Sequence, residues 1–258
     1  MNSIHPTAVV SVAAELEDCS IGPFAVIGEG VRMHGVSVGA HAVVDGQAQI
    51  GPRTQIFPHT VIGGPAQVRG ADPSLGELRI GEDCIFREHS TVHRGSPRGT
   101  GLTQIGNRNL FMAGSHVAHD AIVGSDCTFA NYAAIGGHVE IGDHATLGGM
   151  CGIHQHTRVG RLAMIAAGAI CTLDIPPFAM AHGDRACVLG LNQVGLERAG
   201  ISPQAEWFLA WRLLFGPGPT EAAIKHVRAQ GLTGPEVEEM ITFAQHSRRG
   251  IARWSTRV

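Results

Sequence analysis

The sequence contains few aromatic residues and no long apolar run. Phe, Trp and Tyr make up only 5% of its 258 residues, so the core has to be built from small and branched aliphatic side chains stacked in layers. No stretch approaches the ~20 apolar residues that a membrane-spanning helix requires, and the first residues lack the basic and apolar regions of a signal peptide. We therefore expect a soluble, cytoplasmic protein without a membrane span.

Paired cysteine motifs and a dense basic face are also missing. The six cysteines form no CxxC motif and no disulfide-like spacing, so we expect free and mostly buried thiols. The net charge of −3 divides into −5 over residues 1–190, with 11 basic and 16 acidic side chains, and +2 over residues 191–258, with 8 basic and 6 acidic ones. Such a weakly basic segment argues against nucleic-acid binding, but it could contact an acidic protein.

Glycine, by contrast, is abundant, and the chain has a six-residue period. The 35 glycines are about twice the usual share of roughly 7%. An aliphatic residue or Phe occupies every sixth position from Ile105 to Ile165, and a second run in another phase extends from Val38 to Val92. Neither an α-helix nor a simple strand has this period. Hexapeptide repeats predict a parallel β-helix, in which each repeat forms one short strand and a tight turn.

Two breaks in the repeats and a change of character near Pro176-Pro177 suggest how the chain is organised. Residues 64–77 and 94–101 lose the pattern and are predicted to be loops that leave the β-helix. We divide the chain into a β-helix domain, residues 1–186, and a helical domain, residues 187–258. Helices are expected over residues 205–215 after a Ser202-Pro203 cap, 221–230 with Thr220 as cap, and 235–249. They would cover the open edge of the last coil.

Histidines gather on one edge of the predicted β-helix. If three hexads form one coil, residues 18 apart stack in a column with a spacing of about 4.8 Å. His119, Gly137 and Gln155 then form one column. Asp120, His138 and His156 form the adjacent column. Three coils together place eight polar or small residues at this edge: His116, His119, Asp120, Gly137, His138, His154, Gln155 and His156.

This cluster has the residue types of a general-base site. A histidine beside a carboxylate, as in His119 and Asp120, is a candidate base because imidazole titrates near neutral pH and the acid can orient it. Gly137, one coil away, can offer an unhindered N–H to an oxyanion. The combination suits acyl transfer from a thioester to an alcohol. Because no G-x-S-x-G motif accompanies it, we expect direct transfer without an acyl-enzyme.

Two alternatives use the same residues differently. His116-x-x-His119 and His154-x-His156 could supply three ligands to a catalytic zinc ion, as in the hexapeptide-repeat carbonic anhydrases, although Gln155 and Gly137 would then have no role. The second alternative is a purely structural trimeric β-helix. Such a protein would not need the histidines along this edge.

Several motifs carry a family resemblance that extends almost from end to end. The chain resembles the acyl-[acyl-carrier-protein]–UDP-N-acetylglucosamine O-acyltransferases, which catalyse the first step of lipid A synthesis. The matching motifs are Ile4-His-Pro-Thr-Ala8, Ser90-Thr-Val-His-Arg-Gly95, His116-Val-Ala-His-Asp120, Gly136-Gly-His138, Gly152-Ile-His-Gln155, Asp174-Ile-Pro-Pro177, Gly190-Leu-Asn192 and Gly195-Leu-Glu-Arg198.

The resemblance implies a left-handed β-helix, an exception to the right-handed crossover rule, and a metal-independent homotrimer with active sites between subunits. The substrates would be acyl carrier protein and UDP-N-acetylglucosamine. By the same resemblance His119 removes the proton of the glucosamine 3-hydroxyl, Asp120 supports it, and the Gly137 amide stabilises the oxyanion. The residues implied to position the substrates are His116, His138, His154, Gln155, Asn192 and Arg198.

The chain departs from the family pattern at three contact positions. Residues 67–70 read Gln-Val-Arg-Gly, whereas the family usually has Gln-Asp-Leu-Lys, so two charged groups are missing; Arg69 or Asp72 could substitute. Arg185 replaces a usual histidine, and Ala199 stands where a second arginine is common. A 3-amino sugar nucleotide or another UDP-sugar is therefore an alternative acceptor.

The resemblance also predicts the acyl-chain ruler and the carrier-protein surface. Ala167 aligns with the residue against which members measure the acyl chain, and Gly there admits longer chains. Because a packed interior does not absorb added volume freely, the methyl group is expected to shorten the slot by roughly one or two methylenes. The basic residues expected to meet the acidic carrier protein are Arg212, Arg248, Arg249 and Arg253.

Overall fold

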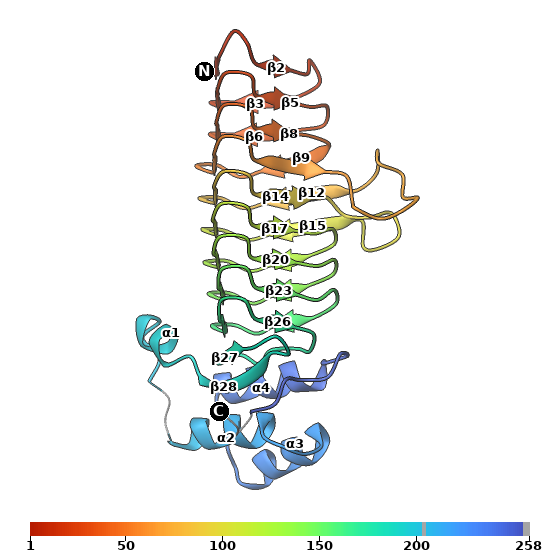
Figure 1. The fold of residues 1–258 in the computed structure, drawn as a ribbon. Coiled ribbons are helices and arrows are strands. Elements are labelled where there is room, and N and C mark those ends of the chain that lie inside the picture. Colours follow the sequence, from red (N-terminus) through yellow and green to blue (C-terminus); the bar gives the residue numbers. More distant parts are fainter. Residues whose placement is uncertain (203–204, 255–258) are drawn as a thin grey trace.

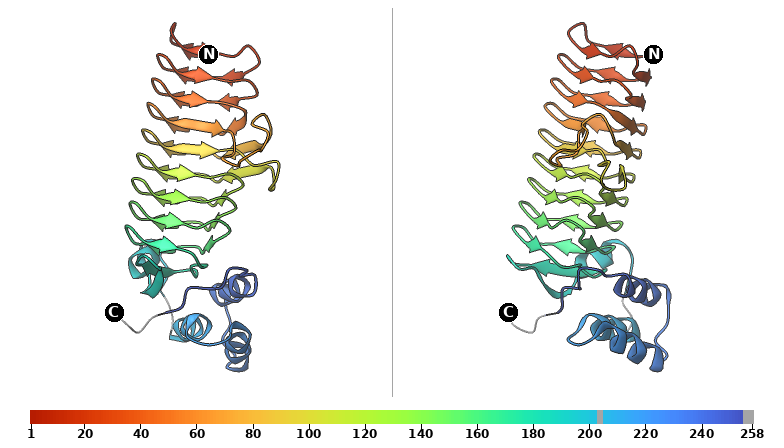
Figure 2. Two further views of the ribbon diagram at one scale, coloured as in Figure 1. Left: turned by 45° about the vertical axis from the view of Figure 1, so that its right-hand side comes forward. Right: turned by 90° about the vertical axis from the view of Figure 1, so that its right-hand side faces the viewer.

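The structure, a computed structural model, describes residues 1–202 and 205–254. It is an elongated stack of coils with helices at its C-terminal end (Figure 1). Each coil contributes one short strand to each of three sheets, and within the stack neighbouring strands of a sheet are parallel (Figure 2). The six-residue period of the sequence therefore corresponds to one side of a coil.

The first sheet has 11 strands: β1 (Ser3–Ile4), β4 (Ser20–Ile21), β7 (Ser37–Val38), β10 (Gln55–Ile56), β13 (Ile85–Phe86), β16 (Leu110–Phe111), β19 (Thr128–Phe129), β22 (Thr146–Leu147), β25 (Met164–Ile165), β27 (Ala179–His182) and β28 (Cys187–Leu191). The second has nine: β2 (Val9–Val10), β5 (Val26–Ile27), β8 (Val43–Val44), β11 (Val61–Gly64), β14 (Thr91–His93), β17 (His116–Val117), β20 (Ala134–Ile135), β23 (Gly152–Ile153) and β26 (Ile170–Cys171). The third has eight: β3 (Glu15–Glu17), β6 (Arg32–His34), β9 (Gln47–Ile50), β12 (Glu77–Ile80), β15 (Leu102–Ile105), β18 (Ile122–Val123), β21 (Glu140–Ile141) and β24 (Arg158–Val159).

The interior of the stack is a column of aliphatic layers. In most of the two-residue strands the second side chain points inward, and these residues form one continuous core. Phe86, Phe111 and Phe129 are the aromatic members, and their rings follow one another at 4.7 and 4.6 Å between centroids. Full burial of such a side chain contributes about 1.5–3 kcal/mol, so the repeat itself stabilises the fold.

The cysteines confirm the expectation of free thiols. Five are buried and Cys187 is half-buried, and all six are free. Burial raises the pKa of Cys127, Cys151 and Cys171 to about 12, which keeps these thiols protonated and unreactive.

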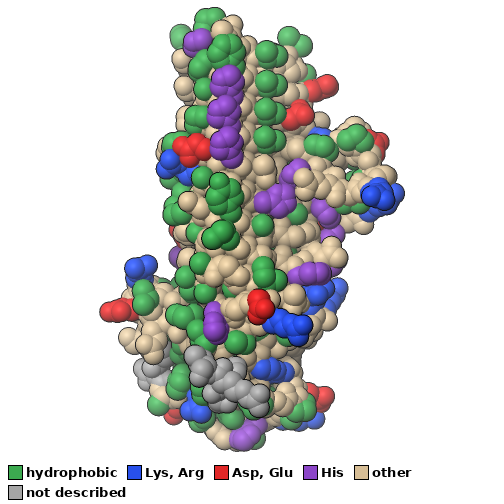
Figure 3. Space-filling model, in the orientation of Figure 1, with side chains coloured by type: hydrophobic (Ala, Val, Ile, Leu, Met, Phe, Trp, Pro, Cys, Tyr) green, Lys and Arg blue, Asp and Glu red, His purple; other side chains and the backbone are tan. Residues whose placement is uncertain are grey.

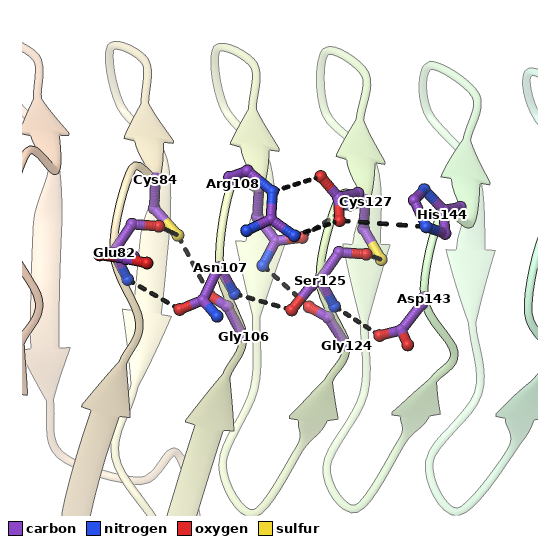
Figure 4. A network of polar contacts seen from close by, with 12 residues as sticks. Glu82, Cys84, Gly106, Asn107, Arg108, Gly124, Ser125, Cys127, Asp143 and His144 are labelled. Carbon is purple, nitrogen blue, oxygen red and sulfur yellow. Dashed lines mark hydrogen bonds and ion pairs between the residues drawn. The ribbon is translucent and has the colours of Figure 1, made fainter. Parts of the chain in front are cut away.

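Polar side chains tie successive turns together at the corner between the third and first sheets (Figure 4). Asn107 accepts the Glu82 N–H at 3.0 Å, Ser125 accepts the Asn107 N–H at 3.0 Å, and Asp143 accepts the Ser125 N–H at 2.7 Å. Each side chain satisfies a turn amide that the strand ladders leave free. This ladder fixes the stacking of the coils that carry the histidines on the opposite side of the third sheet.

Both predicted loops are confirmed as excursions from the coils. Residues 65–76 connect β11 to β12, and residues 94–101 connect β14 to β15. The two loops project side by side from the stack (Figures 1 and 2). All other corners are short, and many place a non-glycine residue at positive φ.

The C-terminal segment closes the stack. The antiparallel hairpin β27–β28 follows the last coil, and within the described part of the chain four helices come after it: α1 (Gln193–Arg198), α2 (Ala205–Phe215), α3 (Thr220–Ala229) and α4 (Pro235–Gln245). Trp211 of α2 donates its indole N–H to the carbonyl of Pro177 at 3.0 Å. Glu239 of α4 pairs with Arg161 at 2.9 Å. The helices thus cover the open end of the β-helix, as expected.

Two details of the predicted helices were wrong, and one lies outside the described residues. Thr220 is not a cap but the first helical residue, because its hydroxyl accepts a hydrogen bond from Arg253 instead. The last helix ends at Gln245 and not at residue 249, because Ser247 turns to bond Asp174. Pro203 of the expected cap pair lies outside the described residues. The division at residues 186 and 187 falls at the turn of the β27–β28 hairpin and stays a prediction.

Candidate active site

The histidine edge lies where the second sheet turns into the third. His116, Ala134 and Gly152 pair in register across β17, β20 and β23, so residues 18 apart do stack. The N–H of His138 donates to the carbonyl of His119 at 3.1 Å, and the N–H of His156 to that of Gly137 at 3.0 Å. The two columns of stacked residues predicted from the 18-residue spacing are confirmed.

The second column projects outward because its backbone is left-handed. Asp120, His138 and His156 have φ values of 59°, 60° and 63°, a region that Asp and His enter more readily than most side chains. The rings of His138 and His156 stack with 4.5 Å between centroids. The repeated corner conformation therefore aims three polar side chains in the same direction.

His119 and Asp120 form a tight pair at the centre of the cluster. His119 Nδ1 lies 2.7 Å from Asp120 Oδ2, and the Asp120 side chain is fully buried while that of His119 is 16% exposed. An ionised carboxylate can only accept, so Nδ1 carries the proton. The Nε2 lone pair of His119 is then available to accept a proton from a substrate.

The Asp120 carboxylate receives further hydrogen bonds from the loop of residues 94–101. It accepts the N–H of Ser96 at 3.0 Å, the Thr100 hydroxyl at 2.9 Å and the N–H of Gly101 at 2.9 Å. Burial raises the pKa of this carboxyl group, but the hydrogen bonds outweigh burial and lower it overall. Asp120 is therefore ionised at neutral pH, as its role of orienting His119 requires.

A catalytic zinc ion does not fit this donor set. His119, Asp120 and His138 are close enough to share a cation, whereas the zinc alternative takes its three ligands from His116, His119, His154 and His156. Asp120 already accepts four hydrogen bonds, which use its lone-pair positions. A cation at this carboxylate would have to displace the loop or the His119 ring.

Two other histidines of the cluster are neutral at pH 7. Burial, reinforced by His93 and His119, lowers the pKa of His116 to about 4, and its Nδ1 lies 2.8 Å from the Thr91 hydroxyl. The pKa of His138 is also lowered, chiefly by burial, although Asp120 acts in the opposite direction. Neutral imidazoles can accept or donate one hydrogen bond each without adding charge to the site.

A depression of about 450 Å³ lies beside the pair. Its lining includes His116, His119 and His154, the backbone of Gly136 and Gly137, and Gln67 from the loop of residues 65–76. A Cβ on Gly137 would lie 2.6 Å from Cε1 and 2.7 Å from Nε2 of His119. Only glycine leaves room for the ring, and the Gly137 N–H has no backbone acceptor among the described residues. The space can hold a reacting group between a base and a free amide.

Comparisons with known proteins identify the family. Residues 174–252 match the model described as UDP-N-acetylglucosamine O-acyltransferase, domain 2, and residues 102–137 match that of the bacterial transferase hexapeptide. The acyl-[acyl-carrier-protein]–UDP-N-acetylglucosamine O-acyltransferase of Syntrophobacter fumaroxidans is 42% identical over 97% of this chain and 99% of its own length. The chain belongs to this acyltransferase family. The hexapeptide resemblance and the acyltransferase assignment made from the sequence are thus confirmed.

Solved structures support the same assignment. The UDP-N-acetylglucosamine acyltransferase of Francisella novicida superposes with a TM-score of 0.92 at 31% identity, covering 98% of this chain and 95% of that one. The acyltransferase of Bacteroides fragilis gives 0.91 at 33% identity, covering 97% and 100%. The predicted fold, a left-handed parallel β-helix with C-terminal helices, is confirmed. Among the described residues, the acyltransferase has no helix that is both long and apolar enough to span a membrane.

Three predicted site residues lie away from the histidine cluster. Asn192 is buried, donates to the Leu162 carbonyl at 2.9 Å and caps α1 by accepting the Gly195 N–H at 3.0 Å. Arg198 is the exposed last residue of α1. Ala167 lies at the exposed corner between β25 and β26. His154 and Gln155 are exposed at the histidine edge, where they were expected.

The candidate carrier-protein arginines differ in their surroundings. Arg253 donates to the Leu214 carbonyl at 2.9 Å, Arg249 donates to the Thr172 carbonyl at 3.0 Å, and the Arg212 guanidinium lies 4.9 Å from the Trp254 ring centroid. These contacts have a structural role in the helical segment. Arg212 and Arg248 are exposed, whereas Arg249 and Arg253 are half-buried, so the first two are the more accessible to an acidic partner.

The sequence analysis missed residues that β14 and the two loops bring to the site. Thr91 contacts His116, Thr100 contacts Asp120, and Gln67 lines the depression. Thr91 pairs in register with His116 across 25 residues instead of 18, because the loop of residues 94–101 is inserted between them. The loop lengthens this coil by seven residues, and subtracting seven from the count would have placed Thr91 in the column of His116.

Proposed function

We propose that the protein transfers a 3-hydroxyacyl chain from acyl carrier protein to the 3-hydroxyl of UDP-N-acetylglucosamine in the cytoplasm, the first step of lipid A biosynthesis. The observation that carries the catalytic part of this proposal is the buried Asp120 carboxylate 2.7 Å from His119, with Gly137 under the imidazole. Family membership supports the two substrates.

The reaction needs only proton transfer and an amide donor. His119 Nε2 takes the proton of the acceptor hydroxyl while its oxygen attacks the thioester carbonyl carbon. The carbonyl oxygen becomes an oxyanion, which the free N–H of Gly137 stabilises. The C–S bond then breaks, and the thiolate of the carrier receives the proton from the His119 imidazolium. Asp120 stays ionised throughout and stabilises that imidazolium, as in other His–carboxylate pairs.

A homotrimer would complete the site. The second sheet and its edge with the first carry exposed apolar side chains, including Val9, Phe24, Tyr132, Met150 and Ile170. Exposed apolar patches of this kind are typical of protein contacts. Asn192 and Arg198, which lie away from the histidines, would then serve the site of a neighbouring subunit. A trimer mass in analytical ultracentrifugation tests this arrangement.

The acceptor and the donor can be tested together by mass spectrometry. The protein is incubated with several acyl carrier protein thioesters and, in turn, with UDP-N-acetylglucosamine and its 3-amino analogue. Ester formation on the 3-hydroxyl sugar is the expected product. Acylation of the amino sugar alone would replace the proposed acceptor with the alternative one, and inactivity with every donor would overturn the proposal.

The Ala167→Gly variant should prefer a longer acyl chain than the wild type. Ala167 lies between two and three coils beyond His119, about 13 Å along the stack at the usual strand spacing. Ala167 is exposed in the single chain, so the acyl slot would form where a neighbouring subunit of the proposed homotrimer covers this corner, and removing the methyl group there would add room for roughly one or two methylenes. In a competition assay with donors of graded length, the preferred chain should lengthen. An unchanged ranking of donors would show that the acyl chain does not end at Ala167.

A further inference from the structure

The loop of residues 65–76 lies against the loop of residues 94–101 along most of its length. The N–H of Glu77 donates to the Gly101 carbonyl at 2.8 Å, the N–H of Gly95 to the Glu77 carbonyl at 2.9 Å, and the N–H of Arg94 to the Gly64 carbonyl at 3.0 Å. These bonds fix where the first loop leaves and rejoins the coils. They leave its middle part to be held by side chains.

Three side chains from β14 and the second loop hold four carbonyls of the first loop. His93 donates through Nδ1–H to the Pro65 carbonyl at 2.7 Å, and the buried Arg94 donates to the carbonyl of Pro73. Arg98 donates to the carbonyls of Arg69 and Gly70 at 3.3 and 3.0 Å. These acceptors are spaced from one end of the first loop to the other, so its position depends on the second loop.

The first loop has little apolar anchorage of its own. Its large apolar residue Leu75 is 49% exposed, and its internal bonds form local turns, such as that from the Ala71 N–H to the Val68 carbonyl at 3.0 Å. Segments with few buried contacts open easily. The two guanidinium contacts of Arg98 therefore restrain a part of the loop that the core does not.

Both loops reach the active site. Gln67, two residues before Arg69, lines the depression with His116, His119 and His154. The second loop is bonded to Asp120, and a Cβ on Gly99 would lie 2.4 Å from Asp120 Oδ2. Figure 3 shows histidines beside this projection and basic side chains at its tip. The second loop is thus fixed to the carboxylate that orients the base and holds the first loop over the substrate space.

We propose that Arg98 is a positioning residue for the nucleotide-sugar acceptor. Its two hydrogen bonds to the loop of residues 65–76, which we call the latch, hold this loop over the depression so that Gln67 faces the acceptor. This inference rests on the proposed function for the identity of the acceptor. Arg98 is exposed, in contrast to Arg94, so its removal leaves the core of the β-helix unchanged. The effect is expected on acceptor binding and not on proton transfer.

The test compares Arg98→Ala and Arg98→Lys with a matched control. In steady-state assays Arg98→Ala should raise KM for UDP-N-acetylglucosamine about 5- to 20-fold with kcat within about twofold, because the two exposed hydrogen bonds of Arg98 act on the acceptor only through the position of the loop. Arg98→Lys keeps one donor group, so its KM should lie between those of the wild type and Arg98→Ala. Arg79→Ala removes an exposed arginine of β12 that pairs with Glu77 at 2.9 Å, and it should leave both constants unchanged.

Amide hydrogen exchange tests the contact between Arg98 and the loop independently of the enzymatic activity. Amides of residues 66–75 should exchange faster in Arg98→Ala than in the wild type or Arg79→Ala. Unchanged exchange together with unchanged KM would overturn the latch. A lower kcat at constant KM would overturn the assignment to acceptor binding and point to an effect through Asp120. If the wild type proves inactive with every UDP-sugar while exchange still increases, the proposed function and the role in acceptor recognition fail but the loop contact stands.

Discussion

Replacing His119 with alanine should lower kcat for acyl transfer by at least about 10²-fold, the usual contribution of a positioned general base. The variant loses the only imidazole bonded to Asp120 among the described residues, at 2.7 Å. His138 cannot replace it, because its Nε2 lies 3.8 Å from Asp120 and its pKa is lowered. Single-turnover assays with a saturating acyl donor measure the loss directly.

His144→Ala provides the matched control for this experiment. His144 is half-exposed on another corner of the stack and lies 4.0 Å from Asp126, so it also has a carboxylate neighbour but lies away from the His119 site. Its variant should keep full activity. His119→Ala should keep the melting temperature and the nucleotide-sugar affinity of the wild type. Retained turnover in His119→Ala would remove this residue from the role of base.

The site residues whose stacking was predicted correctly from the sequence lie on the regular coils. Once the six-residue period is recognised, the separation of 18 residues places His119 under Gly137 and Asp120 under His138, and the observed register agrees. The reason is physical: parallel ladders repeat the same corner, so side chains at equivalent positions must stack. A separation of 18 residues in the sequence therefore corresponds to one coil, or about 4.8 Å, along the stack.

The loops account for what the sequence could not predict. No periodicity relates Ser96 or Thr100 to Asp120, because an inserted loop can fold back in many ways. Two arginines, Arg94 and Arg98, determine the course of residues 65–76 through carbonyl contacts that carry no sequence signature. The same holds at the C-terminus, where Ser247 bonds Asp174, 73 residues earlier in the chain, and ends the last helix early.

Gly137 has two roles that a substitution can separate. The sequence analysis assigned it an unhindered N–H for the oxyanion, and the structure adds that its missing side chain makes room for the His119 ring. An alanine would keep the N–H. Its φ does not lie in the left-handed region, so the backbone accepts a Cβ without strain. Only the steric role is therefore changed in Gly137→Ala.

The Gly137→Ala variant should lower kcat by about 10²-fold with little loss of stability. A Cβ at 2.6 Å from Cε1 of His119 forces the ring to move, and a displacement of about 1 Å in a reacting group costs on the order of 10²-fold. The ring is the end of a side chain, so it can rotate away without unfolding the coil, at the expense of its bond to Asp120. The control is again His144→Ala, which changes a corner away from the His119 site. Both variants should melt near the wild-type temperature, and only Gly137→Ala should lose turnover. If Gly137→Ala retains kcat within about threefold, His119 does not act as the base from the position that the structure gives it.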